Sequence, residues 1–289
     1  MLAAVAPWFR LVRFSHSVFA LPFALASAWL ASGGVPEARV LLLLVVCAVA
    51  ARTAAMAFNR LVDRRLDAEN PRTRGRELPS GELRPLPVLL LVIVSSAAFV
   101  AGAFALNPFC GRLSLPVLAV LLGYSFVKRR SWVAHGVLGL CLALAPLGAW
   151  AAVTGNLSGD LAPPLFLAGA VLLWVAGFDL IYACQDAEHD QSVGLHSIPA
   201  RFGTAAALRT SSVLHVAAGL LLVAFGTAAG LGLPYWIVVV VAAALLVWQH
   251  AIVSPDDLSR VDVAFFTLNG WVGLALFLGL ALDLHLRAG

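Results

Sequence analysis

The stretch 57-AFNRLVDRRLD-67 decides how this chain is organised, because a long apolar run ends there and charged side chains begin. On a helix, Asn59, Asp63 and Asp67 lie at i, i+4 and i+8, so three oxygen-bearing side chains share one face. The spacing therefore predicts a polar stripe along the last turns of an apolar helix.

A second stretch with the same character, 179-DLIYACQDAEHD-190, closes another apolar run about 120 residues later. Asp179, Asp186 and Asp190 lie at i, i+7 and i+11, which again predicts one helical face. Two facing acidic stripes repel each other unless a hard cation lies between them, and carboxylate oxygens suit Mg²⁺, which proteins usually share with substrate phosphates. We therefore expect one Mg²⁺ site built from both stretches, with the carboxylates of Asp63 and Asp186 less than about 10 Å apart.

The composition excludes a soluble globular protein. Hydrophobic residues make up 61% of the 289 residues and charged residues only 12%, which leaves too little polar surface for a water-exposed domain of this size. The four cysteines are scattered without metal-ligand spacing, so they predict core packing rather than a zinc site or a disulfide framework. We expect a lipid bilayer as the surroundings and no nucleic acid as a partner.

The apolar runs predict an all-α integral membrane protein. Each run is close to the length of about 20 residues that crosses a bilayer. Residues 1–289 are expected to form a single transmembrane domain, with nine helices around a central cavity and cytosolic loops as a cap. The nine predicted spans are 17–32, 38–58, 86–106, 113–127, 134–153, 162–183, 207–230, 233–252 and 263–284.

The basic residues predict the orientation of these spans. With nine spans, one set of connections carries fifteen lysines and arginines and the opposite set carries three. The positive-inside rule makes the richer set cytoplasmic. Both acidic stretches then face the cytosol, in a membrane of the bacterial inner-membrane type.

Two cytosolic connections are long, at 60–85 and 184–204. The first carries seven arginines, and the second carries acidic and histidine side chains. Contact with anionic lipid is enough to explain a basic loop. Binding of a diphosphate through metal and arginines explains why basic and acidic side chains occur together, and this second interpretation predicts an enzyme.

These motifs resemble those of the UbiA superfamily of membrane prenyltransferases. The first stretch is similar to its Asn-x-x-x-Asp-x-x-x-Asp signature, and it continues into 70-NPRT-73 and 76-RELPSG-81. Tyr124 and Lys128 resemble a Tyr-x-x-x-Lys element, and Tyr182, Asp186 and Asp190 resemble the second aspartate motif. The resemblance spans most of the chain.

The resemblance implies a Mg²⁺-dependent enzyme that moves a polyprenyl chain from polyprenyl diphosphate to an aromatic acid in ubiquinone or menaquinone biosynthesis. The metal ligands that it implies are Asn59, Asp63, Asp67, Asp186 and Asp190, and the four aspartates among them are the implied catalytic residues. Those expected to bind the diphosphate are cationic: Arg72, Arg76, Lys128 and Arg129. Those expected near the acceptor or behind the ligands are Arg52, Tyr124, Asp179 and Tyr182.

The first motif departs from the family pattern. Members that act on 4-hydroxybenzoate commonly begin it with Asn-Asp, whereas this chain has Asn59-Arg60. That departure is similar to a branch associated with menaquinone made through futalosine, whose acceptor would be 1,4-dihydroxy-6-naphthoate. The sequence leaves both acids as candidate acceptors.

Arg52 has two competing interpretations. It precedes Asn59 by seven residues and therefore lies on the same helical face, about 10 Å away along the axis. An arginine at that depth in a membrane is costly unless it is paired or solvated. It either binds the acceptor's carboxylate or forms a structural pair with Asp179.

Two other classes of protein share part of this pattern. A secondary transporter of an anionic metabolite also combines many helices with buried charge, but its sites lie near the bilayer midplane and often between internal repeats. A CDP-alcohol phosphotransferase also uses aspartate pairs with magnesium, but the Gly-rich pattern between its aspartates is absent from this sequence.

Overall fold

The computed structural model describes residues 2–13 and 19–288, and over these ranges the chain is built from helices. Eight helices are long and apolar enough to cross a membrane, as a chain with the composition of an integral membrane protein requires. They are Ala38–Glu69 (α3), Pro85–Leu106 (α4), Pro108–Val127 (α5), Ala134–Thr154 (α6), Ala162–Ser192 (α7 with its extension), Thr204–Ala228 (α10), Leu233–Ala251 (α11) and Val263–Arg287 (η3 with α12).

The all-helical membrane fold is therefore confirmed, whereas the count of nine spans stays a prediction. The expected first span, 17–32, corresponds to α2 (Leu21–Ser32), which has 12 residues, fewer than a bilayer needs. Residues 17 and 18 of that span lie outside the described residues. An additional short helix, α1 (Leu2–Leu11), precedes it.

Three boundaries differ from the prediction for local reasons. The first long connection is shorter than expected, because α3 continues to Glu69 and only residues 70–84 form turns. The fourth span begins at Pro108 rather than 113, since proline fits the first turn of a helix, where its missing N–H is not needed. The second connection contains the short helices α8 (Ala187–Ser192) and α9 (Ile198–Phe202).

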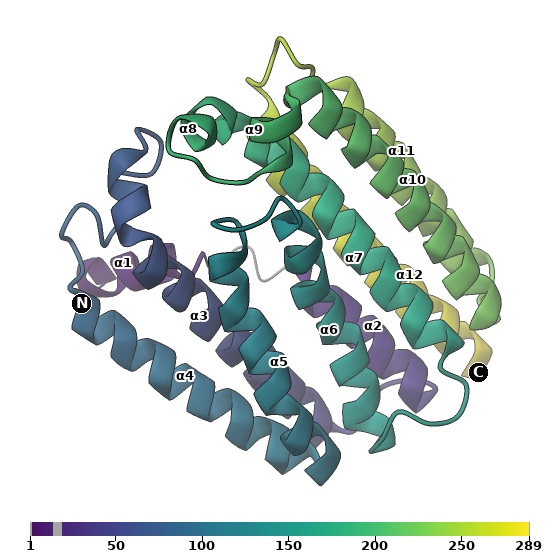
Figure 1. Cartoon of the computed structure of the whole chain (residues 1–289). Coiled ribbons are helices and arrows are strands. Elements are labelled where there is room, and N and C mark those ends of the chain that lie inside the picture. The colour runs from purple at the N-terminus through teal and green to yellow at the C-terminus, as the bar shows by residue number, and fades with distance from the viewer. Residues whose placement is uncertain (1, 14–18, 289) are drawn as a thin grey trace. The chain divides into compact units, whose positions relative to one another are not determined.

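The chain divides into two compact units. Unit 1 comprises Met1–Ser17 with Leu42–Ser125, and unit 2 comprises Val18–Leu41 with Phe126–Gly289. In unit 1, α3, α4 and α5 run side by side (Figure 1). A Cβ placed on Gly102 of α4 would lie 2.9 Å from Cys47 Sγ of α3, so these two helices touch closely where the glycine removes the side chain.

The connection 70–84 of unit 1 is fastened to α1 by charge. Arg10 Nη2 donates to both carboxylate oxygens of Glu82, at 2.6 and 2.7 Å, and Arg10 Nε lies 3.4 Å from Glu77 Oε1. The hydrogen bond to Glu82 raises the pKa of Arg10 further above its ordinary value. This fastening holds the connection against the start of the chain.

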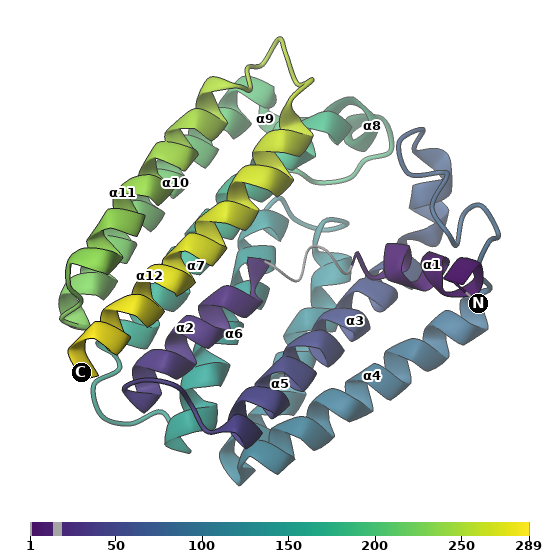
Figure 2. The same cartoon turned by 180° about the vertical axis from the view of Figure 1, so that it is seen from behind.

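In unit 2, α7 is the central helix. It packs against α6 and α10, while α2 packs against α6 and α12, and α11 packs against α12. Figure 2 shows α10, α11 and α12 running along one another from behind. Gly139 of α6 lies against the backbone carbonyl of Leu172, where a Cβ would collide with that oxygen, so α6 and α7 are in backbone contact.

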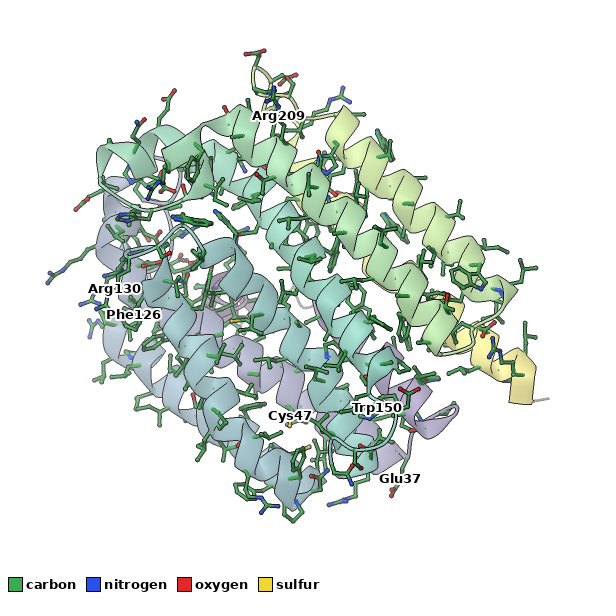
Figure 3. All side chains as sticks on the ribbon, turned by 45° about the vertical axis from the view of Figure 1, so that its right-hand side comes forward. Glu37, Cys47, Phe126, Arg130, Trp150 and Arg209 are labelled. Carbon is green, nitrogen blue, oxygen red and sulfur yellow. The ribbon has the colours of Figure 1, made fainter. Side chains whose placement is uncertain are left out.

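Unit 2 has two distinct ends. Glu37 and Trp150 lie near one end and Arg209 lies near the other (Figure 3). The end that includes Arg209 also holds α8 and α9, and the backbone N–H of His196 donates there to Lys128 O at 2.9 Å. That hydrogen bond joins the connection before α6 to the connection after α7.

Candidate functional site

The first acidic stripe lies on one uninterrupted helix, as predicted. Asn59 Nδ2 donates to Asp63 Oδ2 at 3.2 Å, and the side chains of Asp63 and Asp67 are buried within α3. Asp63 is only 1% exposed. Burying a carboxylate destabilises the folded protein unless hydrogen bonds or positive charge compensate it. The carboxylates of this stripe therefore need cations close by.

Two arginines hold Asp67. Arg76 Nη1 lies 2.7 Å from Asp67 Oδ1, and Arg60 Nη1 lies 3.9 Å from Asp67 Oδ2. Thr73 Oγ1 also donates to the backbone oxygen of Asp67, at 3.0 Å. Arg60 is 5% exposed, and its buried Nε has no hydrogen-bond partner among the residues that the structure describes. Asp67 therefore lies in a cationic clamp made by α3 and the 70–84 connection.

Arg52 lies on α3 and is half-buried. Its Nη2 donates to the backbone oxygen of Arg13 at 3.2 Å, and within the described part of the chain its buried Nε has no hydrogen-bond partner. No carboxylate pairs with it among the residues that the structure describes. Arg52 thus offers a guanidinium whose hydrogen-bonding capacity is only partly used.

The remaining predicted residues of unit 1 have simpler surroundings. Arg72 is exposed, and its backbone N–H donates to Asn70 Oδ1 at 2.9 Å within a turn of the 70–84 connection. Tyr124 is half-buried near the end of α5. The structure therefore brings the polar residues of the first motif and the 70–84 connection together at one end of unit 1.

The second acidic stretch differs from the prediction. The α-helix α7 ends at Ala183, a 3₁₀ turn covers Cys184–Asp186, and α8 follows. A 3₁₀ turn advances about 120° per residue instead of about 100°, so three residues in this turn rotate the start of α8 by roughly 60°. The prediction of one continuous α-helical face through Asp179, Asp186 and Asp190 is therefore wrong at this turn.

Asp186, in the 3₁₀ turn, and Asp190, in α8, are both half-buried. Ser197, which caps α9, lies near the Asp190 carboxylate, and Asp186, Lys128 and His189 are close enough to act on that carboxylate electrostatically. Arg129 is exposed, with its guanidinium 6.0 Å from the ring centre of Phe126. Unit 2 thus places a second pair of carboxylates beside a lysine.

Asp179 has a partner that the sequence did not indicate. Its Oδ2 lies 2.7 Å from Nδ1 of His135, the second residue of α6. His135 is 6% exposed. This pair leaves Asp179 occupied within unit 2.

A column of aromatic rings lies along α7, on the N-terminal side of Asp186. Tyr182, Phe178 and Trp174 come before it at successive four-residue steps, which places them on one face of the helix. Phe265 closes the column, with its ring centre 4.4 Å from that of Tyr182 and 5.2 Å from that of Phe178. The rings of Trp174 and Phe178 are 4.9 Å apart, edge to face.

A π-helical turn, η3 (Val263–Leu268), positions Phe265 in this column. Asn269 Nδ2 donates to Ala264 O and Phe265 O at 3.0 and 2.9 Å, and Asn269 Oδ1 accepts from Trp174 Nε1 at 2.8 Å. Such turns interrupt the regular α-helical hydrogen bonds, and they are frequent at functional sites. Asn269 supplies partners to the backbone of η3 and ties it to α7.

Each unit therefore holds hard oxygen donors, which is the ligand chemistry of Mg²⁺. Among the described residues, no group of three His, Cys, Asp or Glu side chains forms a complete metal site. Mg²⁺ commonly takes only one or two carboxylates and completes its shell with water and substrate phosphates. Asp63 fits such a role, and so does the buried Oδ2 of Asp67, which has no hydrogen-bond partner within residues 2–13 and 19–288.

The sequence matches a known family over most of its length. Residues 20–271 match the model of the UbiA prenyltransferase family. The chain belongs to this family. It is therefore a member of a family of prenyltransferase enzymes, and this confirms the resemblance and the predicted class of enzyme. The transporter and phosphotransferase alternatives are set aside.

Individual proteins are similar in sequence to this UbiA family member over most of its length. The 4-hydroxybenzoate octaprenyltransferase of Ectopseudomonas mendocina is 35% identical over 263 residues, covering 90% of this chain and 86% of the relative. That of Nitrosospira multiformis is 33% identical over 260 residues, covering 90% and 88%.

Solved structures share the fold. The apo structure of a UbiA homolog from Aeropyrum pernix K1 superposes with a TM-score of 0.80 at 31% identity, covering 95% of this chain and 98% of that one. A UbiA homolog from Archaeoglobus fulgidus bound to GPP and Mg²⁺ superposes with a TM-score of 0.70 at 20% identity, covering 95% and 99%. The second likeness shows the fold alone.

Sequence reasoning missed four residues of this region. His135 begins a segment, 135–139, that resembles the family pattern, but its contact with Asp179 was not predicted. Phe265 lies in an apolar span where nothing in the spacing marks it, and Asn269 acts on a π-turn that sequence periodicity does not reveal. Arg60 was visible as a departure from the family motif, but its contact with Asp67 was not predicted.

Proposed function

We propose that this UbiA family member transfers a polyprenyl chain from polyprenyl diphosphate to an aromatic acid, with Mg²⁺ as its cofactor. The observation that carries the proposal is the pair of carboxylates in each unit, beside arginines in unit 1 and a lysine in unit 2. A diphosphate with its metal needs both signs of charge at once. The names of the curated relatives support the same reaction.

The proposed metal ligands are Asn59, Asp63 and Asp67 in unit 1 and Asp186 and Asp190 in unit 2. Bound Mg²⁺ would neutralise charge on the diphosphate leaving group. Arg72 and Arg76 would contact the diphosphate oxygens from unit 1, and Lys128 and Arg129 from unit 2. We propose that residues 1–289 act as one domain, with the two acidic pairs serving one substrate.

The allylic carbon becomes electron-poor as its bond to the diphosphate breaks. The rings of Tyr182 and Phe178 on α7 come next, with Phe265 of η3 beside them, and an aromatic face attracts a cation at about 0.5–2 kcal/mol. The same rings exclude water, which would otherwise capture the cation as an alcohol. The apolar spans give the polyprenyl tail surroundings as apolar as lipid.

The acceptor is proposed to be 4-hydroxybenzoate, because the curated relatives at 33% and 35% identity carry that name. Arg60 in place of an acidic residue favours 1,4-dihydroxy-6-naphthoate as the second candidate. Both are anionic aromatic acids, and Arg52 would bind the carboxylate of either, since a planar guanidinium suits it bidentately. The arginine-rich connections support a site on the cytoplasmic side of a bacterial-type inner membrane.

A reconstituted assay tests the proposed reaction. The purified protein, in lipid nanodiscs with Mg²⁺ and a polyprenyl diphosphate, is offered each acid separately, and products are identified by mass spectrometry. We expect one acid to gain the mass of the prenyl chain, and the product to disappear when EDTA removes the metal. Failure of both acids with several chain lengths would contradict the proposal.

A further inference from the structure

The pair formed by His135 and Asp179 has a feature that the proposed binding of metal and diphosphate does not use. His135 Nδ1 lies 2.7 Å from Asp179 Oδ2, whereas His135 Nε2 is buried and has no hydrogen-bond partner among residues 2–13 and 19–288. A carboxylate accepts hydrogen bonds, so Nδ1 carries the hydrogen and Nε2 has a free lone pair. The ring therefore presents a proton acceptor in a buried place.

A second buried histidine of unit 2, His215, lacks the unpaired nitrogen that His135 has. His215 is 3% exposed, and both of its nitrogens are satisfied: Nε2 lies 3.1 Å from Trp174 O and Nδ1 lies 2.8 Å from His250 Nε2. A histidine that serves only packing is expected to be paired in this way, because a buried polar atom without a partner destabilises the folded protein. His135 carries that cost.

The fold fixes the pair. Backbone contact between Gly139 and Leu172 sets the spacing of α6 and α7, and His135 is one turn from Gly139 while Asp179 is two turns from Leu172. The helices packed against α6 are α2 and α7. The helix α2 has no titratable side chain, and α7 contributes only Asp179 and Tyr182.

The depth of the pair suits the proposed reaction. Asp179 precedes Asp186 by seven residues, which is about 10 Å along the helix. A single aromatic ring fills a gap of that size between the leaving group and a base. With the leaving group bound at Asp186, as proposed, the His135–Asp179 pair would lie about one ring's length from it.

We propose that His135 is the catalytic base of the prenyl transfer and that Asp179 is its positioning residue; this inference rests on the proposed function. The bond from C1 of the prenyl chain to the diphosphate oxygen breaks, and the diphosphate leaves with the electron pair. A bond forms from C1 to a ring carbon of the acceptor, and the hydrogen on that carbon leaves as a proton to His135 Nε2. Asp179 stabilises the imidazolium until the proton passes to solvent.

The experiment compares His135→Gln and Asp179→Asn with the wild-type protein in nanodiscs, at saturating Mg²⁺ and both substrates. Loss of a general base costs about 10²–10⁴-fold in rate. We expect kcat of His135→Gln to fall by about 100-fold or more, with KM for both substrates within about threefold of wild type. His250→Gln, which alters a hydrogen-bonded imidazole of the same unit, is the matched control and should keep its kcat.

An acceptor deuterated at the reacting ring carbon separates a base from a structural residue. When the base is removed, proton loss becomes rate-limiting, so His135→Gln should show a primary isotope effect on kcat that wild type lacks. Asp179→Asn should show a smaller one. Activity of His135→Gln at the wild-type level, or a slow variant without an isotope effect, would overturn the proposal.

The two proposals fail differently. If wild type prenylates no aromatic acid, the proposed function is wrong. If wild type does so and His135→Gln does so equally fast, only the role of His135 is wrong. Melting temperatures are measured for every variant, and if His135→Gln is unstable, His135→Asn replaces it in the isotope comparison.

Discussion

The two acidic pairs of this protein lie in different chemical surroundings. In unit 1, Asp67 lies between two guanidinium groups, with Arg76 at 2.7 Å and Arg60 at 3.9 Å. In unit 2, Asp186 follows a column of aromatic rings along α7, and the His135–Asp179 pair joins α6 to α7. Lys128 acts on the second acidic pair, and the ring faces and the proton acceptor distinguish unit 2 from unit 1.

This difference suggests a division of labour. Under the proposed function, arginines of α3 and the 70–84 connection in unit 1 would supply most of the positive charge that a diphosphate needs, with Lys128 and Arg129 of unit 2 supplying the rest. The ring faces and the base of unit 2 would serve the carbocation and the aromatic ring. The acidic pairs themselves are the shared part, because both are expected to meet the same metal and leaving group.

The largest expected effect tests the shared part. Asp63→Ala and Asp186→Ala should each lower kcat by about 10³-fold or more, because each removes a charge-stabilising ligand where the leaving group departs. Both variants should stay folded and membrane-inserted, as measured by size-exclusion chromatography and melting temperature. If either variant retained substantial activity, its half of the site would be dispensable.

A smaller effect is expected at Arg52, which lies in unit 1 but is proposed to bind the acceptor. Arg52→Lys should raise the KM of the aromatic acid by about tenfold, because an ammonium cannot form the bidentate contact, and should leave the KM of the prenyl diphosphate unchanged. A drop in melting temperature with unaltered acceptor KM would instead make Arg52 part of the scaffold.

The variant Phe265→Leu tests whether the aromatic column stabilises the cation. Replacing the ring with an aliphatic side chain should lower kcat by about three- to tenfold, the value of a lost cation–π contact, and should increase the share of prenyl alcohol from water capture. Phe225→Leu on α10 makes the same change at a buried ring of unit 2 outside the column, and it is the matched control. An unchanged product ratio for Phe265→Leu would remove its ring from the chemistry.

The smallest effect is expected at Arg10, which fastens the 70–84 connection from outside. Exposed ion pairs contribute little, so Arg10→Ala should change the melting temperature by about 2 °C or less and leave kcat unchanged. A large loss of activity would mean that unit 1 depends on this fastening to position Arg76.

Features that depend on one segment were predictable from the sequence. The stripe of Asn59, Asp63 and Asp67 needed only a continuous helix, and α3 provides one. The second stripe failed because a 3₁₀ turn begins at Cys184, and tertiary packing decides such a turn.

Pairs far apart in the sequence were out of reach of the same reasoning. His135 and Asp179 are 44 residues apart, and their contact depends on the backbone approach at Gly139. Phe265 joins the aromatic column only because Asn269 satisfies a π-turn. Periodicity in one segment says nothing about either contact.

The central claim is that the two acidic pairs serve one metal–diphosphate complex. The most direct measurement is Mn²⁺ binding, monitored by electron paramagnetic resonance in the presence of inorganic diphosphate, for Asp63→Asn, Asp186→Asn and the double variant. Groups that act as one unit give strongly non-additive losses. We expect each single variant to weaken Mn²⁺ binding by about tenfold or more and the double variant to be no weaker than the worse single one. Losses that multiply in the double variant, as for independent sites, would contradict the account.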